Sequence, residues 1–161
     1  MSKRKFKETF KKGEFEPNNE RYLIGIDPGA DTGFAIWDQK DKILLQVCTF
    51  KMYKAQKTVL FCREELSSII VFIEDARLRK WYGKGDTSVK LQGVGSVKRD
   101  SMLWEEFCEY EKIPFKLIAP KSQKGKTKVE EEEFKLYSGW KKRTSEHARD
   151  AAMLVFGRGR Y

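Results

Sequence analysis

The sequence of 161 residues has few cysteines and no long apolar run. Its three cysteines are an odd number without CxxC spacing, so neither a disulfide framework nor a zinc knuckle is indicated and a reducing compartment is expected. No apolar run approaches the ~20 residues of a membrane span, and the basic N-terminus is not followed by an apolar signal region. We therefore expect a soluble, cytoplasmic protein that makes no contact with a membrane.

Acidic residues are also too few to balance the basic ones. Against 33 Lys and Arg there are only 24 Asp and Glu, which gives a formal net charge of +9 and a pI near 9.4. This excess suits a polyanionic partner, with nucleic acid as the first candidate, although it can also serve only to keep a small protein in solution. With 40% hydrophobic residues, the chain has enough apolar surface for the core of one globular domain.

The hydrophobic pattern divides the chain into an arm and one domain. Residues 1–20 are rich in Lys and Arg, contain few aliphatic residues and end in Pro17-Asn18-Asn19, so a flexible basic arm is predicted, followed by a domain over 21–161. In that domain, strands are predicted over 22–27, 33–38, 42–50, 69–74 and 114–119, and helices over about 55–67, 97–112, 129–137 and 145–157. The first three strands are expected to form an antiparallel meander, and the segment 77–95 is expected to be a Gly-rich basic loop.

Two acidic residues follow apolar strands. Asp27 ends the run Leu23-Ile24-Gly25-Ile26 and stands directly before Pro28-Gly29, a sharp turn that would hold its carboxylate at a sheet edge. Glu74 ends the apolar run 69–73, where burial of a carboxylate is costly unless it is paired or binds a metal. Oxygen ligands of this kind suit hard cations such as Mg²⁺. The alternatives are an ordinary turn aspartate and a glutamate at the solvated rim with Asp75 as its exposed neighbour; Asp75 itself should point to the opposite face.

The third motif lies in the last predicted helix. His147 is the single histidine of the chain, and Asp150 follows it by three residues, so both side chains lie on one side of the helix. Alanines at 148, 151 and 152 permit close packing of this helix. Taken alone, the pair is better explained as a helix-start histidine with a surface aspartate.

Together these motifs resemble the RuvC family of Holliday-junction resolvases, which are nucleases of the ribonuclease H type. The run I-G-I-D-P-G-A-D-T-G around Asp27 is similar to the family's first-strand motif, Glu74 matches its acid at the end of the fourth strand, and H-A-R-D-A-A at 147–152 resembles its last-helix motif. The likeness spans about residues 22 to 156. It implies a ribonuclease H-like α/β fold, in which a mixed five-stranded sheet, an antiparallel meander followed by parallel strands, is flanked by helices.

The resemblance also implies an activity. In that family the matched acids bind two divalent ions, which align a water for attack on a phosphodiester and stabilise the leaving oxygen. Asp27, Glu74 and Asp150 are therefore the expected ligands of two Mg²⁺ ions, or of Mn²⁺, and His147 is expected either to contact the second metal or to handle a proton. The expected reaction is paired cleavage of a Holliday junction or another branched DNA.

Two features depart from the cellular family: the basic N-terminal arm and the Gly-rich basic region after Glu74. They suggest a phage or viral member, acting in the bacterial cytosol or an infected host cell. They also leave open how strictly a four-way junction is required.

Basic and aromatic residues near these motifs are candidates for DNA contacts. Cations would hold phosphates and aromatic rings would stack on unpaired bases. The candidates are Arg77, Arg79, Lys80, Trp81, Tyr82, Lys84, Lys121, Lys124 and Lys126, with Lys128 and 141–143 as further phosphate contacts. The alternative is ordinary surface, with Trp81 packed on the core.

The predicted helix 97–112 carries an apolar side marked by Met102, Leu103, Phe107 and Tyr110. This side is either monomer core or a surface for pairing with a second subunit. Resolvases of this resemblance are dimers, and two sites related by a two-fold axis would cut two strands symmetrically, so a homodimer is expected.

Two other functional classes compete with this interpretation. The first is an actin-like or sugar-kinase ATPase, because Asp27-Pro28-Gly29 followed by Thr32-Gly33 also forms a phosphate loop in that wider fold family. Such ATPases close two domains around the nucleotide, for which 161 residues are too few, so no nucleotide cofactor is expected. The second is a branched-DNA-binding protein without catalysis, against which the set of acids counts, since carboxylates repel phosphate unless a cation intervenes.

Overall fold

A computed structural model describes residues 21–66, 68–78, 87–120 and 129–158. The elements in chain order are β1 (Tyr22–Asp27), β2 (Asp31–Asp38), β3 (Ile43–Lys51), α2 (Met52–Glu65), β4 (Ile69–Glu74), the short 3-10 helix η1 (Ala76–Leu78), α3 (Thr87–Tyr110), β5 (Phe115–Ile118), α4 (Glu131–Ser138) and α5 (Glu146–Val155). The predicted basic arm, residues 1–20, lies outside the described residues.

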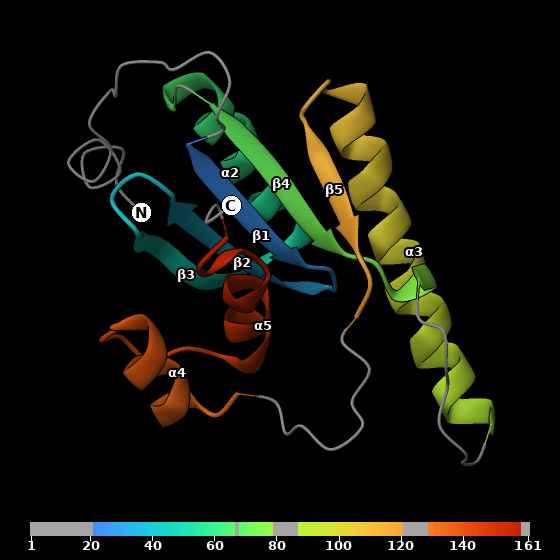
Figure 1. The fold of residues 1–161 in the computed structure, drawn as a ribbon. Helices are drawn as coiled ribbons and strands as arrows, with labels where there is room; N and C mark the ends of the chain where they lie inside the picture. The colour runs from blue at the N-terminus through green and yellow to red at the C-terminus, as the bar shows by residue number, and fades with distance from the viewer. Residues whose placement is uncertain (1–20, 67, 79–86, 121–128, 159–161) are drawn as a thin grey trace.

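The strands form one five-stranded sheet in the order β3-β2-β1-β4-β5 (Figure 1). The β1–β2 and β2–β3 pairs are antiparallel, whereas β1–β4 and β4–β5 are parallel. A short turn is enough to join β1 to β2, but a parallel neighbour needs a crossover. Helix α2 carries the chain from β3, at one side of the sheet, to β4 beside β1, and α3 connects β4 to β5. The predicted mixed α/β sheet, a meander followed by parallel strands, is therefore confirmed.

Helices cover both faces of this sheet. Because side chains alternate along a strand, Ile24 and Ile26 of β1 pack with residues of α2 and α3, while Leu23 packs with residues of α5 and α4. Trp104 of α3 is fully buried in the first layer, and Phe134 of α4 in the second. Figure 1 shows α2 behind the sheet and α5 in front of it, so β1 and β4 are buried between two layers of helices.

The backbone of α5 lies directly against the sheet. A Cβ added to Gly25 would stand 2.0 Å from the carbonyl oxygen of Ala151, and one added to Gly33 would stand 1.9 Å from that of His147. Only glycine fits such an approach. On the helix side, Ala148, Ala151 and Ala152 are fully buried, as the small side chains predict. Glycines of β1 and β2 thus set the distance at which α5 holds His147 above the sheet.

The start of α3 differs from the prediction. The helix begins at Thr87, ten residues before the expected start at 97, so the prediction that residues 87–95 are a loop is wrong. Gly93 and Gly95 suggested a loop because each glycine costs a helix ~1 kcal/mol. The fully buried Trp104 and Cys108 anchor the same helix, and such packing outweighs local propensity.

The apolar side chains of α3 do not form one face. Phe107 packs against the core, whereas Met102, Leu103 and Tyr110 are exposed, Tyr110 by 85%. The two readings of this helix therefore apply to different residues: Phe107 joins the monomer core, and an apolar strip stays on the surface. In the described part of the chain, none of the helices has the length and apolar character needed to cross a membrane.

Candidate active site at one edge of the sheet

Asp27 and Glu74 are the last residues of two neighbouring parallel strands. The register pairs Ile26 of β1 with Ile73 of β4, so the two acids that follow lie next to each other at the same edge of the sheet. Asp27 has 14% of its side chain exposed, and Glu74 is partly buried. The carboxyl ends of parallel strands are where open α/β sheets usually bind ligands.

The turn after Asp27 is held by a hydrogen bond of its own. Thr32 Oγ1 donates to the carbonyl oxygen of Gly29 at 2.7 Å, and Thr32 is fully buried. This contact closes the turn that the Pro28-Gly29 pair predicted. Asp27 is therefore fixed at the end of a buried strand by a short, rigid connection to β2.

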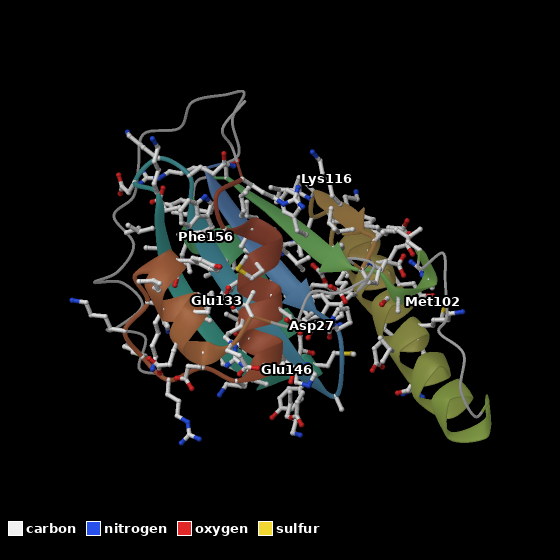
Figure 2. All side chains as sticks on the ribbon, turned by 60° about the horizontal axis from the view of Figure 1, so that its bottom comes forward. Asp27, Met102, Lys116, Glu133, Glu146 and Phe156 are labelled. Atoms are coloured by element: carbon white, nitrogen blue, oxygen red, sulfur yellow. The ribbon has the colours of Figure 1, made fainter. Side chains whose placement is uncertain are left out.

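Helix α5 carries His147 to Asp27. Ser145 caps the helix by accepting a hydrogen bond from the backbone N–H of Ala148 at 3.1 Å, as its residue type predicts. His147 Nδ1 then lies 2.8 Å from Asp27 Oδ2, with 52% of the histidine side chain exposed. Figure 2 shows Asp27 beside α5, near the end of the helix marked by Glu146. Residues 120 positions apart thus meet across the sheet edge.

Asp150 follows His147 by one helical turn on α5 and is partly buried. Carboxylate oxygens suit Mg²⁺ or Mn²⁺, so the donor types of Asp27, Glu74 and Asp150 fit such an ion. Among the residues that the structure describes, however, no three side chains of the types His, Cys, Asp and Glu gather closely enough to hold a metal. The backbone thus brings candidate metal ligands to one edge of the sheet, but in the described residues their side chains do not form a complete metal site.

On the β4 side of the edge, Asp75 is paired with Arg77. Asp75 is 1% exposed, and Arg77 Nε and Nη2 both donate to its carboxylate at 2.8 Å. Nη2 of Arg77 also contacts Glu105 of α3. Burial is the largest single influence and would raise the pKa of Asp75, but the hydrogen bonds and charge of Arg77 together outweigh it, so the pKa is lowered. The hydrogen bonds of Asp75 and then Glu105 raise the pKa of Arg77.

This pairing bears on two expectations. Asp75 is buried and ion-paired, so its description as an exposed neighbour of Glu74 is wrong. Arg77, a predicted phosphate contact, already serves two carboxylates, and a role in DNA binding stays a prediction. The Asp-x-Arg spacing after a strand is the signal from which this pair could have been found.

On the β3 side of the edge lies a cation that the sequence did not single out. Lys51, the last residue of β3, faces Asp31, the first residue of β2, and Nζ is 2.5 Å from Asp31 Oδ1. The hydrogen bond from Lys51 is the main cause that lowers the pKa of Asp31, and His147 adds to the effect. Because β2 pairs antiparallel with both β1 and β3, the ends of β1 and β3 lie at the same edge of the sheet. No local pattern in the sequence indicates that Lys51 and Asp31 face each other.

Most of the predicted DNA contacts lie outside the described residues. This applies to Arg79, Lys80, Trp81, Tyr82, Lys84, Lys121, Lys124 and Lys126.

The order of strands and the helix layers are those of a ribonuclease H-like α/β fold. Among solved structures, the chain is similar to T. thermophilus RuvC, determined in complex with a Holliday junction substrate, with 16% identity, a TM-score of 0.53 and coverage of 84% of this chain and 90% of that one. A likeness at this identity shows the fold. No protein-family model and no curated protein matched the sequence.

Proposed function

We propose that the protein is a divalent-metal-dependent endodeoxyribonuclease that cuts Holliday junctions or other branched DNA by phosphodiester hydrolysis. The observation that carries the proposal is the contact of His147 with Asp27, whose strand ends beside the strand that ends in Glu74. The same fold serves a protein that was solved with a junction substrate. The net charge of +9 favours a polyanionic partner.

Asp27, Glu74 and Asp150 would hold the metal, for which Mg²⁺ is the first candidate and Mn²⁺ the second. A bound divalent ion supplies an activated water and stabilises the leaving oxygen. Asp27 contacts His147 through Oδ2, and a carboxylate can accept several partners, so Asp27 could serve as a metal ligand with that contact in place. His147 would then be available at the same edge to contact the metal or to accept a proton.

A homodimer would place two such sites around one branch point. The exposed strip on α3, Met102, Leu103 and Tyr110, supports this proposal, because large apolar side chains at a surface often mark a contact. Replacing Leu103 and Tyr110 by Ser should lower the molar mass measured by light scattering towards that of one chain. A single-chain mass for the wild-type protein at micromolar concentration would contradict the dimer.

The test is incubation with labelled four-way junction, fork and duplex DNA, with and without Mg²⁺. Paired nicks in the junction are expected only with the metal. Equal cutting in excess EDTA would overturn metal dependence, and binding without cutting under every divalent ion would favour a non-catalytic branched-DNA-binding protein.

A further inference from the structure

The candidate active site has a cation on either side, and the two differ in how they are held. Arg77 lies on the β4 side and is shared between a buried aspartate and Glu105. Lys51 lies on the β3 side, where 63% of its side chain and 58% of that of Asp31 are exposed. An exposed ion pair contributes little to stability, so Lys51 can exchange partners at low cost, whereas Arg77 would have to abandon a buried carboxylate.

The Lys51 side of the edge is also tied to α5. Thr49, two residues before Lys51 on β3, has its hydroxyl oxygen 2.5 Å from that of Ser145, the residue that caps α5. Asp31 begins β2, and Gly33, two residues further along that strand, pairs with Asp27 at the end of β1. The Lys51–Asp31 pair and the Asp27–His147 pair thus lie at the same edge of the sheet, on neighbouring strands.

We propose that Lys51 binds a DNA phosphate next to the one cleaved at Asp27 and Glu74, and that Asp31 holds Lys51 until DNA replaces it. The inference rests on the proposed nuclease function. A phosphodiester oxygen would take the place of Asp31 Oδ1 on the ammonium group, and Asp31 would be left in solvent. Because Asp31 competes with DNA for the same cation, it would weaken binding to every DNA alike and reduce the retention of cut product.

The first measurement is binding of labelled junction to the full chain in EDTA at several salt concentrations. Lys51→Ala should weaken binding about two- to fivefold at low salt, since the contact is exposed. The slope of log affinity against log salt should fall by up to ~0.9, the value for one duplex phosphate. The matched control is Lys40→Ala, which removes the same charge from an exposed lysine in the turn between β2 and β3, at the opposite edge of the sheet.

The second measurement separates release of Lys51 from a general change of charge. Asp31→Asn should tighten binding, because the lysine loses its competitor. The same substitution in the Lys51→Ala protein should have no effect if Asp31 acts through Lys51. If Asp31→Asn increases DNA affinity equally in the wild-type and the Lys51→Ala protein, Asp31 only repels DNA through its negative charge. That result would overturn the proposal that Asp31 and DNA compete for Lys51.

Failure of this inference can be told from failure of the proposed function. If the wild-type chain neither binds nor cuts branched DNA, the proposed function is wrong. If it does both, and Lys51→Ala binds as Lys40→Ala does with the same salt slope, only the role of Lys51 is refuted. Equal melting temperatures for the variants would show that the differences do not arise from loss of fold.

Discussion

Replacing Gly33 by alanine tests how closely α5 must approach the sheet. The added Cβ would stand 1.9 Å from the carbonyl oxygen of His147 and 3.1 Å from the Cβ of Asp27. Non-bonded atoms pack at roughly 3.5 Å, so α5 or β2 would have to retreat by more than ~1 Å. This movement would separate His147 and Asp27, which are now 2.8 Å apart.

Two results are expected from this displacement. Forcing extra volume into a packed contact costs ~1–3 kcal/mol, which corresponds to a fall in Tm of about 2–4 °C per kcal/mol in a chain of this size. A misplacement of ~1 Å at a reacting centre costs on the order of a hundredfold in rate, so kcat for junction cleavage should fall by that factor while junction binding in EDTA changes little.

The matched control is Gly93→Ala in α3. A Cβ at Gly93 meets no atom within 4 Å, so this change should be neutral or stabilise the helix by up to ~1 kcal/mol. The measurements are single-turnover cleavage and a melting curve for each variant. If Gly33→Ala cleaves at the wild-type rate and melts with the wild-type protein, the close approach of α5 is not what organises the site.

The remaining predictions concern charges at the edge. Asp27→Asn, Glu74→Gln and Asp150→Asn should each abolish cleavage and preserve junction binding by a gel-shift assay, with non-additive losses because the ligands act as one unit; near wild-type turnover in any of them removes that residue from the site. Arg77→Ala should lower the free energy of unfolding by ~1–3 kcal/mol, because it leaves the buried Asp75 carboxylate with fewer donors; unchanged denaturant unfolding would contradict this. The pKa of Asp75 is lowered in the folded state, so the ionised carboxylate contributes its full share to the free energy of unfolding at neutral pH. This contribution is lost as pH falls from about 3.9, the usual pKa of an aspartate, through the lower pKa of the folded state. The free energy of unfolding of Asp75→Asn should therefore change less with pH over that acidic range.

The fold was predictable wherever one local pattern decides an element. The run ending in Asp27 and the run ending in Glu74 are each apolar along their whole length, which is typical of a strand covered on both faces. Since both runs end in an acid, their parallel pairing brings the two acids to one edge. The start of α3 was not predictable in this way, because Gly93 and Gly95 favour a loop locally and the packing of Trp104 lies more than two turns away.

Partners across the sheet edge were hidden for a different reason. Lys51 lies opposite Asp31 only because β2 and β3 pair in one register, with an irregularity between Ile36 and Trp37 on the way. A shift of the register by one residue would turn each side chain of the strand to the other face of the sheet. The hydrophobic pattern therefore predicts the face on which a side chain lies, but it does not predict which charged residue of the neighbouring strand lies opposite. Lys51 therefore looks like one of many lysines in the chain. Its neighbours, rather than its residue type, make it the cation to test first.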